Sequence, residues 1–169
     1  MGPDLPFTHF KLFFRESMKR LCMKKFKYFA DSAEFRPGAY AITCSKISIG
    51  NRVVIRPGTM LFSDPRENGA GITIEDDVLL GCCVNFYVNN HDFSNPSIPI
   101  NDQGHLDSKP IVVQKGSWIG ANTTILPGVT IGKNAVLGAG SVATKSIPDN
   151  VIAAGNPARV LNTIEYKFE

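Results

Sequence analysis

The residues best suited to catalysis lie in a polar, turn-rich stretch, FYVNNHDFSNPSIPINDQGHLDSKP, which spans residues 86–110. His91 stands near its start and His105 near its end. An imidazole with a pKa near ~6.5 can take a proton from a hydroxyl or an amine at neutral pH, so either residue could act as a general base. A loop histidine is more often a solvated surface residue. The elements that hold these side chains therefore bear on which interpretation applies.

Two adjacent cysteines, Cys82 and Cys83, are the rival nucleophiles. No second histidine is evidently paired with them, and no helix N-terminus is expected there to lower a thiol pKa. They occupy turn positions, so we interpret them as core or corner residues. MGPDLPFTHF lacks the apolar segment of a signal peptide, so we expect reduced, buried thiols in a cytoplasmic protein. No CxxC pair or histidine cluster indicates a metal site.

The rest of the sequence follows a period of six. Large apolar residues recur at every sixth position in three runs, namely Ile49, Ile55 and Leu61, then Ile74, Leu80 and Phe86, then Val113, Ile119, Ile125, Ile131 and Leu137. A helix requires an apolar spacing near 3.6 and a simple strand requires 2, and neither produces six. Six fits a very short strand followed by a tight turn, and three such units would close one triangular coil. The sequence therefore predicts a parallel β-helix rather than a sandwich of short strands.

The period stops directly after Phe86. In a stack of coils an inserted segment leaves the prism at a corner, and long loops in compact domains are commonly functional. We expect residues 92–111 to form such a loop, with His91 held by the last regular unit at its base. This position favours a catalytic role for His91 over that of a solvated surface residue.

The chain from about Ile47 to Leu161 resembles the hexapeptide-repeat acyltransferases. The most specific stretch is GSWIGANTTILPGVTIGKNAVLGAGSVATKSIPDNVIAAGNPARVL, which is similar to the maltose, galactoside and polysaccharide O-acetyltransferase branch. The resemblance implies a left-handed coil, against the general right-handed rule for parallel crossovers. It also implies acetyl-CoA as the acyl donor, a homotrimer with the donor slot between subunits, and no metal. In the family the histidine that His91 resembles is the general base.

The resemblance extends to individual donor-binding positions. The matching residues are Trp118, Ala121, Ala139, Thr144, Lys145 and Arg159. The tryptophan would line the site near the thioester, and the two alanines would contact the pantetheine arm through their backbone groups. The Thr–Lys pair would approach the arm and the nucleotide end, and the arginine would approach the phosphates.

The acceptor side departs from the family pattern. Such enzymes often present an Asn and a carboxylate from earlier coils, but here Gly58 stands where the Asn is expected. Asp64 is the nearest carboxylate candidate, and Asn85 lies one repeat unit before His91. His105 is a further candidate for an acceptor contact. The identity of the acceptor stays open.

Charge is unevenly distributed along the chain. Residues 11–27 carry seven basic residues and one acidic residue, whereas the remainder carries eleven basic and fourteen acidic residues. A short basic segment on an acidic body argues against a broad nucleic-acid surface. The segment FTHFKLFFRESMKRLCMKKFKYFA is expected to form one amphipathic helix. It would cap the open first coil or contact an anionic membrane surface, which would place the protein at the inner face of the membrane.

Three segments are therefore expected. Residues 1–46 form the basic helix and cap, residues 47–161 the acyltransferase β-helix, and residues 162–169 a C-terminal extension. The favoured function is transfer of an acetyl group to a hydroxyl of a sugar or surface polysaccharide in a ternary complex. An N-acetyltransferase of an amino sugar and a non-catalytic scaffold stay open as alternatives. A zinc carbonic anhydrase of similar fold is disfavoured, because only two histidines lie within the repeat region.

Overall fold

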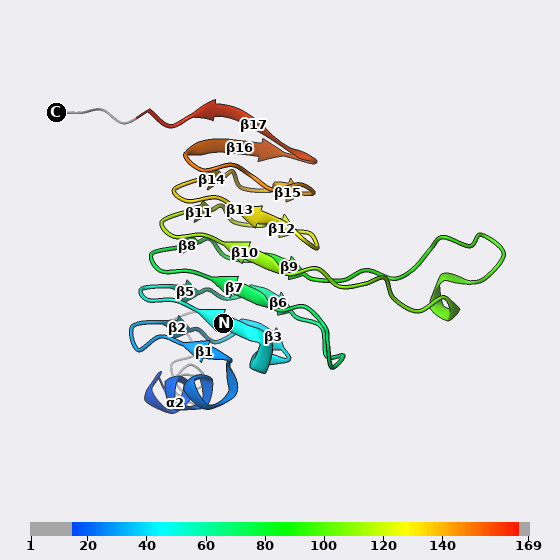
Figure 1. Ribbon diagram of the computed structural model, residues 1–169. Coiled ribbons are helices and arrows are strands. Elements are labelled where there is room, and N and C mark those ends of the chain that lie inside the picture. The colour runs from blue at the N-terminus through cyan, green and yellow to red at the C-terminus, as the bar shows by residue number, and fades with distance from the viewer. Residues whose placement is uncertain (1–14, 166–169) are drawn as a thin grey trace, which may run out of the picture.

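A left-handed parallel β-helix forms the body of the protein in the computed structural model, which describes residues 15–165 (Figure 1). Each coil contributes one short strand to each face of a triangular prism, and each strand pairs in parallel with the strand of the next coil. The fold class predicted from the six-residue period is therefore confirmed.

The three faces are sheets that run the length of the prism, and all their strands pair in parallel except the last one, β17. Face I contains β1 (Tyr28–Phe29), β4 (Ile47–Ile49), β7 (Ile72–Ile74), β10 (Ile111–Val113) and β13 (Thr130–Ile131). Face II contains β8 (Leu79–Leu80), β11 (Trp118–Ile119), β14 (Val136–Leu137), β16 (Val151–Gly155) and β17 (Ala158–Thr163), and the pair β2 (Glu34–Phe35) and β5 (Val54–Ile55) lies beneath it. Face III contains β3 (Tyr40–Ile42), β6 (Met60–Phe62), β9 (Asn85–Tyr87), β12 (Thr124–Ile125) and β15 (Val142–Ala143). Outside the strands lie helix α2 (Arg15–Lys25) and the 3-10 helices η1 (Cys44–Lys46) and η2 (Ile100–Asp102).

The predicted apolar positions form the interior of the prism. Ile74, Val113 and Ile131 are in register on face I, and all three are almost completely buried. Burial of such a side chain contributes about 1.5–3 kcal/mol. The small residues four positions later, such as Thr123 and Ser141, are buried as well and turn the chain at the corners.

Two corners of the prism are used below and are named by the faces they join. Corner II–III includes residues 81–84, 120–123 and 138–141, and corner III–I includes residues 63–71, 88–110 and 144–146. The tight turn at corner II–III needs a left-handed backbone, with φ of 58° at Asn122 and 71° at Gly140. Asn and Gly adopt this conformation most readily.

The stack begins at β1, before the boundary at residue 47 that the period suggested. Phe29 pairs with Ile49, Phe35 with Ile55 and Ala41 with Leu61, so residues 28–42 form one more coil. The six-residue spacing is present there, but η1 then inserts extra residues and shifts the register. The inward residues are also larger, since this coil is the end of the prism and its aromatic rings pack on Phe26 of the preceding turn.

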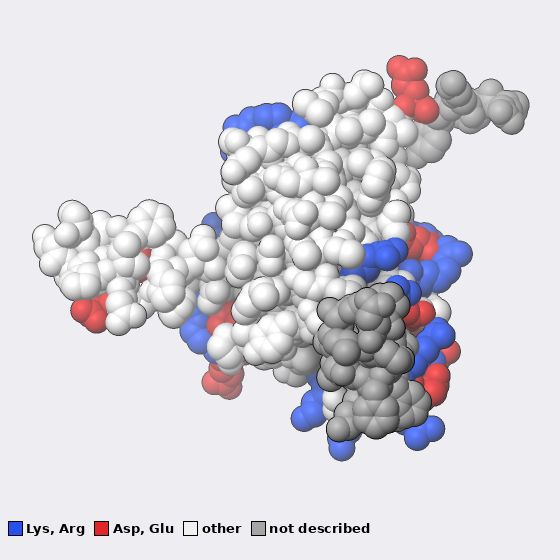
Figure 2. Space-filling view, turned by 180° about the vertical axis from the view of Figure 1, so that it is seen from behind, with Lys and Arg blue, Asp and Glu red and all other residues white. Residues whose placement is uncertain are grey.

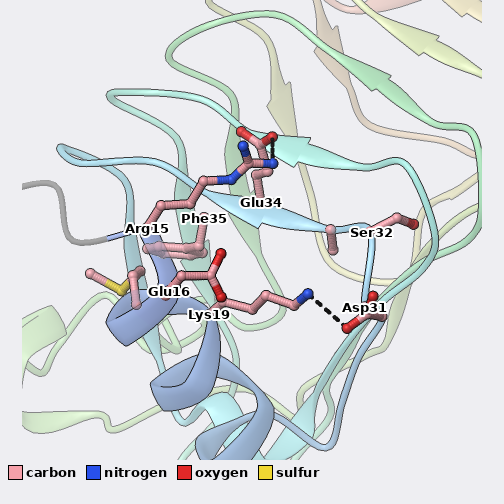
Figure 3. A pocket seen from close by; sticks show the side chains of 9 residues that line it. Arg15, Glu16, Lys19, Asp31, Ser32, Glu34 and Phe35 are labelled. Carbon is pink, nitrogen blue, oxygen red and sulfur yellow. Dashed lines mark hydrogen bonds and ion pairs between the residues drawn. The ribbon is translucent and has the colours of Figure 1, made fainter.

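Helix α2 lies against the end of this first coil (Figure 1). Cys22 is the buried residue of the helix, and two ion pairs, Arg15–Glu34 at 2.9 Å and Lys19–Asp31 at 2.7 Å, join the helix to the coil. The two pairs lie beside a small cavity of about 60 Å³, whose lining side chains are drawn in Figure 3. This packing favours the interpretation of α2 as a cap. The preceding part of the expected helix, with His9, lies outside the described residues.

At the other end the chain turns back on itself. Strand β17 pairs antiparallel with β16 and so extends face II, and the expected boundary between residues 161 and 162 falls inside this strand. Within the described range, 15–165, no helix has the length and apolar character needed to cross a membrane.

Candidate active site

The arm, residues 88–110, leaves the prism at corner III–I and extends away from it (Figure 1). Its base is a two-stranded ribbon, in which the Asp92 N–H donates to the Gly104 carbonyl and the Leu106 N–H donates to the Asn90 carbonyl, each at 3.0 Å. The arm therefore follows the end of the six-residue period at Phe86, but it begins four residues before the expected loop boundary at residue 92 and so includes His91. A backbone ribbon holds its base, and the base lies on the last regular coil before the break.

His91 and His105 face each other across this ribbon. They form an antiparallel bridge in a position flanked by the two backbone bonds, where side chains on opposite strands come closest. Their ring centroids are 4.2 Å apart, with planes inclined by 32°. Both residues are exposed, so an acceptor could reach either imidazole.

Among the described residues, the histidine pair has no further His, Cys, Asp or Glu side chain placed to complete a metal site with it. Across residues 15–165, no three His, Cys, Asp or Glu side chains gather as a metal ion would require. The chemistry available to the pair from its own residues is proton transfer between an imidazole and a hydroxyl or amine held beside it.

Asp64, the candidate carboxylate, lies on the neighbouring loop of the same corner. Its side chain is 1% exposed and is bound by the Arg66 guanidinium, with Nη2 to Oδ2 at 2.6 Å. The hydrogen bonds from Arg66 and from Ser108 hold the pKa of this carboxyl well below its usual range, although burial opposes the shift. Asp64 is thus already occupied within the chain, and direct contact with an acceptor stays a prediction.

A cavity of about 370 Å³ opens beside this ion pair. It is lined by Asp64, Arg66, Glu67, Asn68, Gly69, Asp107 and Ser108. The lining joins the loop after β6 to the returning strand of the arm. Arg66 was not among the residues predicted from sequence, since its contact with the arm depends on which backbone carbonyl the fold brings near.

Asn85 is on β9, the strand that leads into the arm. It is half-buried and points outward on face III, in register with Met60 below and Thr124 above. It is the first residue of β9 and so lies nearer to corner II–III than to the histidine pair, and its predicted role in acceptor binding stays a prediction.

Trp118, Ala121 and Ala139 lie on face II and at corner II–III. Trp118 is 50% exposed on β11, between Leu79 and Val136. Ala121 and Ala139 follow Gly120 and Gly138 in successive coils, and these turns stack closely. A Cβ at Gly120 would lie 2.4 Å from the backbone nitrogen of Ala139. The result is a column of small residues parallel to the prism axis.

The remaining donor candidates lie elsewhere. Thr144 and Lys145 are exposed at corner III–I, above the arm. Arg159 is exposed on β17 at the end of face II, where its guanidinium donates to the Ala158 carbonyl at 2.9 Å. The chain therefore brings the predicted donor residues together in two groups rather than one.

These two groups are separated by the width of face III. Corner III–I holds the histidine pair, Asp64, Thr144 and Lys145, whereas corner II–III and the adjoining face II hold the tryptophan and the alanine column. A single prism cannot fold one corner onto the other. A second copy placed against the first could bring corner III–I of one chain to corner II–III of its neighbour.

Cys82 and Cys83 are corner residues, as one of the two structural interpretations expected. The expectation of buried thiols is wrong for them, because both are exposed at corner II–III, where the turn directs its middle residues outward. Cys83 has a φ of 58°, which the tight turn demands. Cys22 is buried and Cys44 is half-buried, and all four thiols are free.

Comparisons with known proteins agree with this geometry. The family described as "Bacterial transferase hexapeptide (six repeats)" matches residues 110–145. The galactoside O-acetyltransferase of Escherichia coli (strain K12) is 35% identical over 149 residues, which are 88% of this chain and 70% of that protein.

Two solved structures share the fold over most of the chain. A hexapeptide-repeat-containing acetyltransferase of Vibrio cholerae complexed with acetyl coenzyme A is 29% identical, with a TM-score of 0.77 over 87% of this chain and 76% of that chain. A galactoside acetyltransferase in complex with coenzyme A is also 29% identical, with a TM-score of 0.69 over 100% of this chain and 89% of that chain.

Proposed function

Because the chain belongs to the bacterial hexapeptide transferase family, we propose that it moves an acetyl group from acetyl-CoA to a hydroxyl of a sugar or surface polysaccharide. The observation that carries the proposal is the exposed histidine pair at the base of the arm, where an otherwise regular prism is interrupted. The acetyl-CoA complex of the Vibrio cholerae protein and the galactoside acceptor named for the Escherichia coli relative support the donor and the acceptor class.

In this proposal His91 is the general base. Its imidazole takes the proton of the acceptor hydroxyl while the oxygen attacks the carbonyl carbon of the thioester. The tetrahedral intermediate collapses with cleavage of the carbon–sulfur bond, and the proton passes from His91 to the departing CoA sulfur. The reaction takes place in a ternary complex without a covalent enzyme intermediate. Backbone N–H groups near the thioester would stabilise the oxyanion.

The donor would lie between two subunits of a homotrimer. The separation of the candidate residues supports this arrangement, because Trp118, Ala121 and Ala139 of one chain would face the arm of its neighbour. Thr144 and Lys145 would approach the pantetheine arm and the nucleotide end of acetyl-CoA. The exposed Arg159 would contact the phosphates of acetyl-CoA. In Figure 2 the upper coils show few charged side chains on the face in view, which suits contact with a second copy.

The acceptor would bind beside His91, with Asn85 and His105 as its further contacts. Both are polar and reachable, as recognition of sugar hydroxyls requires. N-acetylation of an amino sugar would use the same base and the same groove, so it is the second candidate function. A non-catalytic scaffold is the alternative that these exposed groups disfavour.

The basic segment at the N-terminus has two alternative roles under this proposal, a cap on the first coil or a contact with a membrane. The packing of α2 favours the cap, while Leu21 and Met23 stay about half exposed next to Arg20, Lys24 and Lys25. Such a surface supports peripheral contact with anionic lipid, where a lipid-linked glycan would be found. Co-sedimentation with vesicles rich in anionic lipid, at low and high salt, measures this contact. Absence of salt-sensitive binding leaves only the cap.

The deciding experiment is a calorimetric titration of acetyl-CoA into the protein, followed by release of CoA in the presence of a panel of acceptors. Saturable binding and CoA release with galactosides or oligosaccharides are expected. Release with amino sugars alone would favour N-acetylation. Absence of binding at millimolar acetyl-CoA would reject the enzyme and leave the scaffold.

A further inference from the structure

We propose that Arg66 is a positioning residue for the histidine pair, acting through the backbone of the arm. The expected effect on catalysis rests on the proposed function, whereas the link between Arg66 and the arm does not depend on it. Arg66 does not contact the imidazoles. It binds the backbone carbonyl of Leu106, the residue after His105, and so sets where the second strand of the ribbon lies relative to the first.

The contacts of Arg66 point in two directions. Its Nε donates to Oδ1 and Oδ2 of Asp64 at 3.1 and 2.9 Å, and its Nη2 donates to Oδ2 at 2.6 Å. The same Nη2 also donates to the carbonyl of Leu106 at 3.0 Å. One guanidinium therefore links a buried carboxylate of the prism to the returning strand of the arm.

Leu106 is held from both sides as a result. Its N–H donates to the Asn90 carbonyl at 3.0 Å within the ribbon, and its own carbonyl accepts from Arg66. His105 precedes it and His91 follows Asn90. The two residues that carry the imidazoles are thus adjacent to Leu106 and Asn90, which the ribbon hydrogen bond joins.

The anchor beneath Arg66 is rigid. The Asp64 N–H donates to the Ala70 carbonyl at 3.0 Å, and its carboxylate also accepts the Arg66 N–H at 3.0 Å. A Cβ at Gly69 would lie 2.4 Å from the carboxyl carbon of Asp64, so the loop closes tightly around this side chain. The loop has a second contact with the arm, because the Ala70 N–H donates to the Ser108 hydroxyl at 2.8 Å.

An arginine is needed for this link, and a lysine would not replace it. The planar guanidinium satisfies a carboxylate with two nitrogens and still directs a hydrogen toward a third acceptor, whereas an ammonium is a single point charge. Arg66 is 46% exposed and borders the cavity of about 370 Å³, so packing alone would not fix it. Its orientation comes from Asp64.

The test compares Arg66→Lys with the matched control Arg52→Lys. Arg52 also pairs with a carboxylate, that of Asp77 in the next coil, but this pair lies between faces I and II, away from the arm. For R66K we expect kcat to fall by about 10- to 100-fold with unchanged acetyl-CoA affinity, since a small misplacement of a reacting group has effects of this order. R52K should keep wild-type turnover.

A second readout does not depend on activity. The imidazole signals of His91 and His105 in NMR spectra, assigned with the two His→Gln variants, should move in R66K and stay in place in R52K. If R66K does not yield folded protein, Arg66→Gln replaces it, because glutamine can bond Asp64 without reaching Leu106.

The outcomes separate this inference from the proposed function. Shifted imidazole signals together with a lower kcat support both. Shifted signals in a protein whose wild-type form transfers no acetyl group would keep the geometric link and reject the function. Unchanged signals, or a loss of kcat that only follows a loss of folded protein, would overturn the role of Arg66.

Discussion

The upper coils, from β10 to β15, and corner III–I below them are built on different principles. In the upper coils backbone bonds between successive turns carry the structure, and the interior is a column of aliphatic side chains such as Ile119 and Ile125. At corner III–I the backbone leaves this pattern twice, at residues 63–71 and 88–110. Polar side chains, above all those of Asp64 and Arg66, then hold the loops in place.

The difference predicts where stability and activity separate. An aliphatic column responds to lost volume, so changes there reduce the free energy of unfolding of the whole prism. The loops add little buried apolar area, so changes there alter the position of a few groups. The candidate catalytic side chains lie on the second kind of structure, and the regular coils supply its fixed base.

The strongest expected effect is on activity, with His91→Ala. Without the general base the acceptor hydroxyl keeps its proton, so kcat should fall by about 10²- to 10⁴-fold. Acetyl-CoA affinity and the thermal unfolding midpoint should stay at wild-type values, because the side chain is exposed on the arm. Steady-state kinetics measures kcat, and calorimetry measures the acetyl-CoA affinity and the unfolding midpoint.

A matched variant sharpens this result. His105→Ala removes the neighbouring ring, which the proposal places in acceptor binding, so its main effect should be a higher KM for the acceptor. Equal turnover of H91A and the wild type would overturn the assignment of the base.

The next effect is on stability, with Ile125→Ala. This side chain is completely buried in the column of β12, and its truncation should lower the free energy of unfolding by about 2–5 kcal/mol. Thr124→Ala, one residue earlier and directed outward, is the control and should change the free energy far less. Urea unfolding measures both. Similar losses for the two variants would contradict the division into a packed interior and a tolerant surface.

The ease of prediction from sequence divides in the same way. Val113 to Leu137 could be placed in register because each inward position must be apolar and the spacing never varies. The first coil was not predicted, because η1 inserts residues after Ala41 and breaks the six-residue spacing. Phe29, Phe35 and Ala41 themselves keep this spacing. An insertion of two or three residues is enough to hide a repeat from a fixed spacing.

The candidate site was only partly predictable. His91 stood out because it lies where the period stops, and His105 was noted for its residue type alone. Their contact depends on the pairing of the ribbon, which no local pattern specifies. The link from Arg66 to the Leu106 carbonyl could not be predicted, because any residue at position 106 presents the same acceptor.

Asp64→Asn should have a smaller effect, which is on how the free energy of unfolding depends on pH. The pKa of Asp64 lies below its usual value of about 3.9, so its carboxylate stabilises the folded state fully above that pH. This contribution is lost as the pH falls through the lower pKa of the folded state. D64N should therefore be less stable than the wild type at neutral pH, and the difference should shrink below about pH 4.

Urea unfolding at several pH values measures this dependence. Asp102→Asn, which changes an exposed carboxylate on the arm, is the control and should follow the wild-type profile. A constant difference between D64N and the wild type across the acid range would show that Arg66 does not hold the carboxylate in its ionised form.

Chemical labelling of the thiols perturbs the protein least. It compares the reactivity of Cys22, at the capped end, with that of Cys82 and Cys83 at corner II–III. Burial, followed by the neighbouring Cys44, raises the pKa of Cys22 to about 11, so only about one in a thousand of these thiols is ionised at pH 8. Cys82 and Cys83 are exposed and should react with iodoacetamide much faster, as peptide mass spectrometry would measure. Equal rates at Cys22 and Cys82 would contradict the packing of α2.

The same labelling tests where the donor lies. Cys82 is stacked beneath Ala121, because the Asn122 N–H donates to its carbonyl at 3.0 Å and a Cβ at Gly81 would lie 2.4 Å from the Ala121 nitrogen. If the pantetheine arm follows the alanine column, saturating acetyl-CoA should slow the labelling of Cys82 and leave that of Cys22 unchanged. Unaltered labelling of Cys82 would place the donor away from corner II–III, and the pairing of this corner with the arm of a neighbouring chain would have to be abandoned.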